Sequence, residues 1–529
     1  MLDLIIKNAT IIDGSGCLGF RGDVGVNKGR IVSVGNVDGE AAETIDANGC
    51  VLAPGFIDVH AHGDLFSHVD PLCASKLRQG ITTEIAGQCG LGPAPVRFET
   101  LPVYKSYYEK QGAPLHPKAD TFTSFFTYME ELARQKRGIN MALFAPHGTL
   151  RIAAMGFSPV APDSATLFAM RTMLKEAMQA GALGLSTGLM YAPGSFSFSE
   201  ELLSLCEVAA EYGGIYTSHL RDQGQYLVES VEDALLMGER TGIKVNISHH
   251  KAAGKSNWGK VQKTTAMLSS ARERGIDATH DVYPYTASST TLSATLPPSC
   301  MKEGIETLLA RLSDADYVKE LQQRIFHPTE VWENSLLDCG YDGVLIFRAP
   351  ATPEAEGKSI AQYAQVCGIT PFDAYIRLLR ENKLAVGDIC FSMAQEDVDY
   401  LLKDPYCMFG TDALYVEGMK NTHPRAIGTF PRILGRCVRE NRLLTLEEAV
   451  RKMTSLAADT YKLRDKGRIA VGYDADLTLF DPDKIIDHAD YTNPLARNEG
   501  IIRVYVGGEL ALLEGDPTGL MNGKILKRA

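Results

Sequence analysis

The run FIDVHAHGD at residues 56–64 constrains this chain more than any other segment. A turn-forming LAPG leads into it, and its apolar stretch ends at two histidines that stand two positions apart. Side chains at i and i+2 of a strand point to the same side. His60 and His62, with Asp64 just beyond them, therefore offer the ligands that a transition metal needs. A strand that ends in this way predicts a fold in which strand ends converge on one site.

The middle of the chain alternates short apolar strands with helical segments, which is the pattern of a parallel α/β fold. The predicted strands end at or near eight positions: His60, Ala86, Pro146, Ser186, His219, His249, Tyr283 and Thr411. Eight is the strand number of a TIM-like (β/α)8 barrel, whose active sites lie at the C-terminal ends of the strands. We assign this catalytic barrel to residues 53–464. The interval after Tyr283 is too long for one βα unit, so we expect an inserted subdomain at about 285–350.

Both ends of the chain read as short β-strands. Residues 1–52 include the strand-like LDLIIKNATII and a turn at Asp13-Gly14. Residues 465–529 also alternate strand-like stretches with turns, and Gly507-Gly508 is a hairpin signal. Strands so far apart in sequence must still find partners for their edges. We therefore predict one small β-sandwich domain formed from both termini.

Composition excludes several classes of protein. A net charge of −12 argues against a nucleic-acid or membrane-surface partner. The sequence contains no run of 18 apolar residues, so we expect no transmembrane helix. Its first residues, MLDLIIKNATIIDG, lack the pattern of a signal peptide. Eleven cysteines without regular spacing indicate a reducing, cytoplasmic location. Nothing in the composition fixes the oligomeric state.

Four further residues at predicted strand ends join the two histidines as candidate metal ligands or catalytic groups: Cys89, His219, His249 and Asp412. A lone histidine is more often a core or surface residue, and a lone cysteine is usually a small buried hydrophobe. Several such residues at one end of one barrel favour a metal site instead. Cys89 lies between two glycines beside that site, where a thiolate would be a tight zinc ligand.

The remaining motifs point away from other chemistries. His250 follows His249 and so points to the opposite side of its strand, where we expect it to pack. His147 ends the third strand and is expected only to line the pocket. The GxGxxG pattern, the P-loop and the GxSxG elbow are all absent, which argues against dinucleotide binding, P-loop chemistry and serine hydrolysis.

Several longer strings resemble the D-aminoacylase branch of the amidohydrolase superfamily, the N-acyl-D-amino-acid deacylases. They are GALGLSTGLMYAPG (181–194), SHLRDQG (218–224), SHHKAAG (248–254), DVYPYTASST (281–290) and HPRAIGTFPRILG (423–435). The resemblance spans nearly the whole chain. It implies one zinc ion held tightly by Cys89, His219 and His249, and a second, weaker position near His60 and His62 that Cys89 and Asp412 can reach. Strand four offers no lysine, which argues against a hydantoinase-type or dihydroorotase-type site.

The resemblance also implies an activity, the zinc-dependent hydrolysis of a small N-acyl-D-amino acid to a carboxylate and a free D-amino acid. Asp412 would take a proton from the attacking water and pass it to the leaving nitrogen. Lys251 and Tyr283, with Tyr191 and Arg425 near them, are the implied anchors for the substrate carboxylate. Arg425 could instead hold the loop after strand eight through an ion pair.

Neutral or apolar D-amino acids are the predicted substrates, because the segment STTLSATLPP after Tyr285 carries no cation for a second carboxylate. The inserted segment and the loop at 97–120 could each still deliver an arginine. Two alternatives remain open at this point. One is another amidohydrolase that acts on a cyclic amide or a D-amino-acid dipeptide, and the other is a non-catalytic scaffold.

Overall fold

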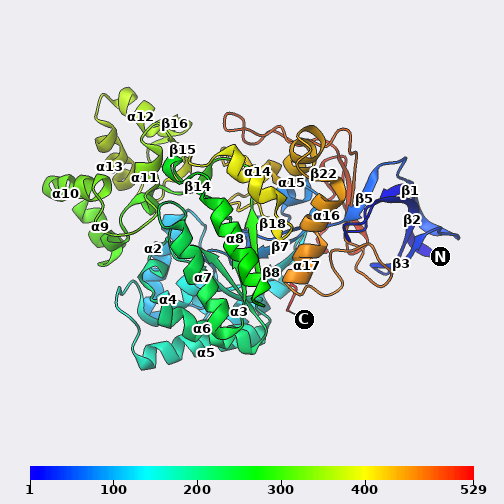
Figure 1. The fold of residues 1–529 in the computed structure, drawn as a ribbon, viewed down its shortest axis with the longest axis horizontal. Helices are drawn as coiled ribbons and strands as arrows, with labels where there is room; N and C mark the ends of the chain where they lie inside the picture. Colours follow the sequence, from blue (N-terminus) through cyan, green and yellow to red (C-terminus); the bar gives the residue numbers. More distant parts are fainter. Residues whose placement is uncertain (529) are drawn as a thin grey trace.

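A barrel forms the centre of the molecule, with a β domain on one side of it and a mainly helical segment that contains a small sheet on the other (Figure 1). The computed structural model describes residues 1–528. Strands β1 (Leu2–Ile11) to β3 (Arg30–Gly35) lie at one end of the long axis, and helices α9 (Ile305–Arg311) to α13 (Pro371–Glu381) lie at the other. The terminal β domain and the inserted segment are therefore separated by the barrel.

The central sheet closes into the predicted eight-stranded barrel. Its strands are β6 (Phe56–Asp58), β7 (Ile81–Ala86), β8 (Asn140–Leu143), β9 (Ala145–Pro146), β10 (Gly184–Gly188), β11 (Ile215–His219), β12 (Lys244–Ile247), β13 (Ala278–Val282) and β18 (Cys407–Phe409). All neighbouring pairs are parallel. Strands β8 and β9 form one interrupted strand, because Phe144 between them donates its N–H to Ala86 at 3.0 Å. The barrel closes where Val59 donates to the carbonyl of Phe409 at 3.3 Å.

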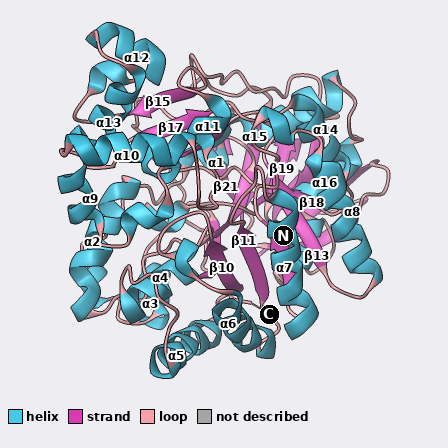
Figure 2. Cartoon of the chain, turned by 60° about the vertical axis from the view of Figure 1, so that its left-hand side comes forward, coloured by secondary structure: helices cyan, strands magenta, loops and turns pink. Residues whose placement is uncertain are grey.

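Burial explains why these segments are strands of a parallel sheet. Every residue of β7, β10, β11 and β13 is buried, as expected when helices cover one face and a packed interior fills the other. Figure 2 shows β10 and β11 inside a ring of helices. The helices outside the inserted segment are α1 (Ala74–Leu77), α2 (Leu101–Gln111), α3 (Phe125–Arg134), α4 (His147–Met155), α5 (Ser164–Ala180), α6 (Ser199–Glu211), α7 (Leu227–Thr241), α8 (Lys260–Glu273), α14 (Gln395–Lys403), α15 (Arg425–Arg432), α16 (Leu446–Met453) and α17 (Ser455–Thr460).

Both termini contribute to one β domain. Its remaining strands are β2 (Phe20–Asn27), β4 (Ala41–Asp46), β5 (Val51–Pro54), β19 (Leu477–Phe480), β20 (Ile501–Val506), β21 (Glu509–Leu513) and β22 (Asp516–Pro517), and with β1 and β3 they form a nine-stranded sheet. The two ends of the chain meet where β19 pairs antiparallel with β5. Residues of β1, β2 and β19 share one hydrophobic core.

The domain limits differ from those predicted at two places. The sheet includes β5 to Pro54, two residues beyond 52, and the last residues leave the domain, because Leu526 donates to Met141 of β8 at 2.7 Å. A strand-like sequence does not reveal which sheet the strand will join. The sequence therefore could not show that the last residues of the 465–529 segment leave the β domain and contact the barrel.

The inserted segment runs well beyond the predicted limit of 350. Its sheet contains β14 (Ser288–Thr291), β15 (Val344–Arg348), β16 (Lys358–Ser359) and β17 (Gly387–Cys390), and its other helices are α10 (Ala315–Phe326), α11 (Ser335–Cys339) and α12 (Ile360–Cys367). Strand β17 pairs antiparallel with both β14 and β15, so the segment is complete only at about residue 390. The length of the interval after Tyr283 indicates an insertion but does not show where it ends, because the last strand is defined by its pairing with β14 and β15.

No helix among the described residues combines the length and the apolar composition that a membrane-spanning helix requires.

Candidate metal centre

Six polar side chains meet at the C-terminal ends of five barrel strands, and we call them the floor of the site. They are His60 and His62 after β6, Cys89 after β7, His219 at the end of β11, His249 after β12 and Asp412 after β18. All six are buried. Their donor atoms form two groups, within each of which all atoms lie within 4.8 Å of one another, and Cys89 belongs to both groups. The structure thus brings together all the ligands that were predicted from separate strand ends.

The first group consists of Cys89, His219 and His249. The sulfur of Cys89 lies 3.6 Å from Nδ1 of His219 and 3.6 Å from Nε2 of His249, and those two nitrogens are 2.9 Å apart. In a tetrahedral zinc site, bond lengths of ~2.0–2.1 Å to nitrogen and ~2.3 Å to sulfur place ligand atoms roughly 3.3–3.6 Å apart. The sulfur–nitrogen distances match this spacing, and the two nitrogens, at 2.9 Å, would have to move apart by about 0.4 Å to reach it. One thiolate and two imidazoles therefore fit a zinc ion that keeps one position for water or substrate.

The second group adds His60, His62 and Asp412 to the shared Cys89. Nε2 of His60 lies 3.3 Å from the sulfur, and Nε2 of His62 lies 3.1 Å from Oδ1 of Asp412. The other oxygen of Asp412, Oδ2, faces Nη1 of Arg425 at 2.9 Å. The carboxylate thus stands between a possible second cation position and a fixed guanidinium group, which already balances part of its charge.

Three floor residues have strained backbones. Cys89, His249 and Asp412 have φ values of 55°, 33° and 47°, in the left-handed region that residues other than glycine rarely adopt. Each such residue costs about 1–3 kcal/mol, and such costs cluster at functional sites. Gly90 has φ 68°, and a Cβ there would lie 2.9 Å from the backbone nitrogen of Gly188. The turn after β7 therefore holds Cys89 in a strained backbone conformation, whose cost indicates a functional reason for its position.

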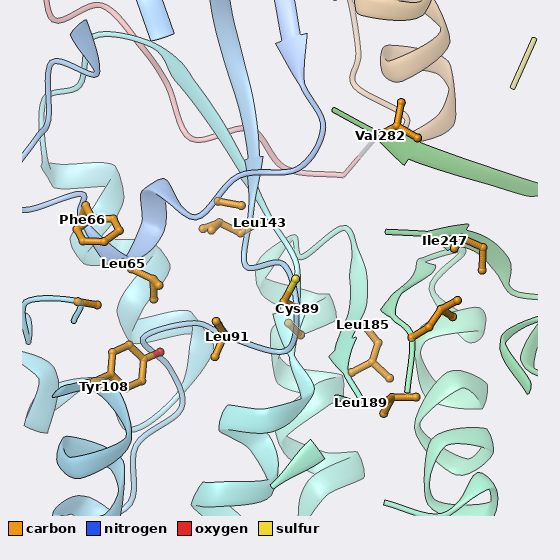
Figure 3. Close-up of a cluster of buried hydrophobic side chains, with 14 of the residues drawn as sticks. Leu65, Phe66, Cys89, Leu91, Tyr108, Leu143, Leu185, Leu189, Ile247 and Val282 are labelled. Carbon is orange, nitrogen blue, oxygen red and sulfur yellow. The ribbon is translucent and has the colours of Figure 1, made fainter. Parts of the chain in front are cut away.

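Cys89 lies among apolar residues, but the histidines beside it favour a metal-binding thiolate. Figure 3 shows its side chain among Leu91, Leu185 and other buried hydrophobic residues. Burial alone would raise the pKa of the thiol, but the charge of His60 and hydrogen bonds from the neighbouring histidines lower it well below its usual value. The thiolate is the form that binds zinc.

Charges around the floor also set the protonation of two other groups. Burial, with the nearby charges of Lys251 and His219, lowers the pKa of His249 to about 3, so that its imidazole is neutral and can bind a metal. Burial would raise the pKa of Asp412, but Arg425 and the nearby histidines hold it well below its ordinary value. Asp412 is therefore an ionised carboxylate that can accept a proton at neutral pH.

Asp281 supports the floor from below, and the sequence reasoning missed it. Its Oδ1 lies 3.1 Å from Nδ1 of His60 and accepts the backbone N–H of His249 at 2.8 Å, while Oδ2 accepts from Asn246 at 2.7 Å. One buried carboxylate thus orients a residue of each ligand group. A signal was present, because Asp281 lies two residues before Tyr283 in β13 and so shares its side of the strand.

A cavity lined by both polar and apolar side chains lies above the floor, and its upper wall, which we call the roof, comes from outside the barrel strands. The roof residues are Gln111, Ser288, Ser289, Thr290, Glu333 and Ser335. Three of the four predicted substrate anchors, Lys251, Tyr191 and Tyr283, also line the cavity. Ser288, Ser289 and Thr290 belong to the string DVYPYTASST (281–290), whereas Gln111, Glu333 and Ser335 lacked any motif or strand-end position that could have identified them from sequence.

The roof is held together across two distant segments. Arg348 of the inserted sheet donates to the carbonyls of Gln111 and Gly112 at 3.1 and 3.2 Å. The hydroxyl groups of Tyr191 and Thr290 are 3.1 Å apart. The predicted loop at 97–120 contains the helix α2. The inserted segment and the end of this helix therefore meet over the cavity, where Arg348 bonds to backbone carbonyls.

The predicted anchors occupy two different places. Nζ of Lys251 lies 3.2 Å from Nδ1 of His249 and donates to the side chain of Gln223, and it faces the cavity. Arg425 lies behind Tyr283, with its guanidinium 4.6 Å from the centre of the ring, and is outside the cavity lining. Its ion pair with the floor carboxylate matches the alternative role for Arg425 that the sequence left open.

Other polar residues near the site lie outside both ligand groups. His250 points away from the floor, and its Nε2 lies 2.8 Å from the hydroxyl of Thr264. His147 bonds to Glu201 at 2.8 Å and is absent from the cavity lining among the described residues. Asp64, which follows the HxH pair, is not part of either group, and burial raises its pKa to about 6.

Comparison with known proteins gives the same class as the fold and the site. The model of the amidohydrolase family matches residues 43–322 and 383–511. The chain is 36% identical to N-acyl-D-glutamate deacylase of Alcaligenes xylosoxydans xylosoxydans, over 100% of this chain and 97% of the relative. It is 33% identical to D-aminoacylase of the same organism, over 99% and 98%. This chain therefore belongs to the amidohydrolase family.

A solved structure extends the similarity to three dimensions. N-acyl-D-glutamate deacylase from Bordetella bronchiseptica, in complex with zinc and a phosphonate that mimics the tetrahedral intermediate, is 34% identical to this chain. The match covers 99% of both chains with a TM-score of 0.84. The similarity thus includes the barrel, the β domain and the inserted segment alike.

Proposed function

We propose that the protein is a zinc-dependent deacylase that hydrolyses the amide bond of N-acyl-D-amino acids to a carboxylate and a free D-amino acid. The observation that carries this proposal is the cavity in which a cysteine–histidine–histidine group, an ionised aspartate and a buried lysine all face one another. The named activities of the two relatives and the zinc in the related structure support it.

The proposed zinc ligands are Cys89, His219 and His249, and a second, weaker position would use His60 and His62 with Cys89 and Asp412. The spacing of the first group supports the tight site. In the second group, Asp412 is already paired with Arg425, which supports weaker binding there. Zinc bound to the first group would supply Lewis acidity and lower the pKa of a bound water toward ~7.

Asp412 is the proposed proton carrier. Its Oδ1 faces the floor histidines and its Oδ2 is held by Arg425, so the carboxylate is fixed where water and the scissile amide must meet. As an ionised group it accepts the proton of the attacking water. It then donates that proton to the leaving nitrogen, because water and nitrogen occupy adjacent sides of the same carbon.

Lys251, Tyr283 and Tyr191 are the proposed anchors of the substrate carboxylate. All three line the cavity, and Lys251 supplies a charge-assisted hydrogen bond. Arg425 contributes by holding Tyr283 and Asp412 in position. Anchoring the carboxylate at one end and the carbonyl at the floor would fix the orientation in which only one enantiomer can react.

The proposed substrates have neutral or apolar side chains. Among the described residues that line the cavity, Lys251 is the only lysine or arginine, and the α-carboxylate already needs it. The arginine that the inserted segment brings close, Arg348, donates to two backbone carbonyls instead. A second carboxylate on the substrate would therefore lack a cation.

Two alternatives have less support. A cyclic-amide hydrolase of the hydantoinase type would use a carboxylated lysine on strand four, and β10 reads GLSTG. Relatives of the D-aminoacylase type are also matched over nearly the full chain. A non-catalytic scaffold has no need of three strained residues around a complete set of metal ligands.

A stereospecific screen tests the proposal. N-acetyl-D-leucine, -methionine and -phenylalanine should be hydrolysed and their L-enantiomers should not, with zinc content measured on the same sample. Turnover of hydantoins or D-dipeptides in place of these substrates would favour the first alternative. A sample without zinc and without activity after zinc is added would favour the scaffold.

A cytoplasmic location is proposed as well. The eleven cysteines that the sequence contains all lie within the described residues and are free thiols there, as expected in a reducing compartment.

A further inference from the structure

A buried carboxylate lines the cavity but has no part in the mechanism described above. Glu333 lies in the loop between α10 and α11, is 3% exposed and contributes to the roof. Its Oε2 accepts the backbone N–H of Gln223 at 3.1 Å. In the described part of the chain, no lysine, arginine or histidine nitrogen lies within 4.0 Å of this carboxylate. Buried carboxylates are usually paired, so an unpaired one at a binding cavity needs a functional reason.

The loop around Glu333 is fixed on both sides. The ring nitrogen of Trp332 donates to the carbonyl of Thr295 at 3.4 Å, and Nδ2 of Asn334 donates to the carbonyl of Ile325 at 2.7 Å. Oδ1 of Asn334 also caps α11. These bonds fix the loop beside the cavity, and the bond from Gln223 holds the carboxylate itself.

Two charges of opposite sign face the upper part of the cavity, the cation of Lys251 and the anion of Glu333. Both groups line the same cavity, so a ligand that lies between them meets one charge of each sign. A substrate with one carboxylate neutralises the lysine. A second carboxylate would then meet only the glutamate.

We propose that Glu333 is a specificity-determining residue that excludes N-acyl-D-amino acids with acidic side chains and accepts neutral and cationic ones. This inference rests on the proposed deacylase function. The chemistry is repulsion between like charges at short range in a poorly solvated cavity, which costs several times more than it would in water. A neutral side chain of equal size has no such cost, and an ammonium or amide group can donate a hydrogen bond to the carboxylate.

Isosteric substrates provide the test on the wild-type enzyme. We expect kcat/KM for N-acetyl-D-glutamine to exceed that for N-acetyl-D-glutamate by roughly 100-fold, from unit charges about 6 Å apart at an effective dielectric constant of about 20. N-acetyl-D-lysine should be hydrolysed at least as well as the glutamine compound. Hydrolysis of the glutamate compound at an equal or higher kcat/KM would overturn the inference while leaving the deacylase function intact. Failure to hydrolyse any member of the series would instead reject the function itself.

The variant Glu333→Gln assigns the discrimination to this residue. It keeps an oxygen that can accept from Gln223, and it should reduce the glutamine-to-glutamate ratio at least tenfold by raising kcat/KM for glutamate. The matched control is Asp338→Asn, which makes the same carboxyl-to-amide change in the next helix but lies outside the cavity lining among the described residues. That control should keep the wild-type ratio. If Glu333 merely accepted the amide N–H common to all substrates, E333Q would lower both kcat/KM values by the same factor, and the unchanged ratio would overturn the inference.

Discussion

The floor and the roof of the cavity are built in different ways. Floor residues stand at the ends of five strands of one hydrogen-bonded barrel, and several are locked by strained backbones and by the shared carboxylate of Asp281. Roof residues come from an inserted sheet, a loop before α11 and the end of α2, joined by bonds such as those of Arg348. Rigid elements suit chemistry that tolerates little displacement, whereas loops can change their side chains without disturbing the barrel. The difference implies that the floor determines the reaction and the roof determines the substrate.

Removing the shared floor ligand should have the largest effect. Cys89→Ala deletes the one atom that both ligand groups use, so we expect zinc to be lost from both positions and kcat to fall more than about 1,000-fold. Zinc measured by elemental analysis after dialysis checks this. The control Cys206→Ala alters another buried cysteine, in α6, and should keep zinc and activity. Full zinc content in the Cys89 variant would show that the thiolate is not a ligand.

Replacing the proton carrier should separate chemistry from metal binding. Asp412→Asn removes the basic oxygen, and kcat should fall by about 100- to 10,000-fold, as for the loss of a general acid–base group. Zinc at the first ligand group should remain, because Asp412 is not part of that group. Zinc content and kcat are measured on the same preparation. Near-wild-type kcat in this variant would remove Asp412 from the mechanism.

The support beneath the floor should have a smaller effect. Asp281→Asn keeps the shape of the side chain but weakens the acceptor that orients His60 and His249. Loss of such an outer carboxylate typically weakens metal affinity by about 10- to 100-fold. Zinc titration by calorimetry measures this change, and the far-ultraviolet circular dichroism spectrum serves as the control for folding. An unchanged affinity would mean that the barrel alone orients these ligands.

The same contrast explains what sequence could predict. Strand ends of a parallel barrel converge by geometry, so residues as far apart as His60 and Asp412 could be placed together from spacing and strand pattern alone. The barrel and the contribution of both termini to a β domain followed from the same alternation of elements. Asp281 could have been found from its position in β13, two residues before Tyr283.

The roof could not be predicted in this way. Glu333 reaches the cavity only because its loop is anchored between two helices of the inserted segment, and no periodicity encodes that contact. Strand β17 pairs with β15 and also with β14, which lies nearly a hundred residues before it in the sequence. The predicted limit of the insertion at 350 was therefore wrong. Long-range pairing of short strands depends on tertiary contacts that local sequence patterns do not record.

Loosening the roof should have the smallest effect and should spare the chemistry. Arg348→Ala removes the two bonds that join the inserted sheet to the end of α2, so Gln111 and its neighbours lose their fixed position over the cavity. We expect KM to rise about threefold to tenfold with kcat nearly unchanged, since the lost interactions are worth about 1–2 kcal/mol and lie away from the floor. The control Arg377→Ala removes an exposed arginine from the same inserted segment, where it pairs with Glu381, and should leave KM unchanged. Zinc content should be that of the wild type in both variants. A fall in kcat or zinc content in the Arg348 variant would show that roof and floor are coupled, and the division between reaction and selectivity would then have to be abandoned.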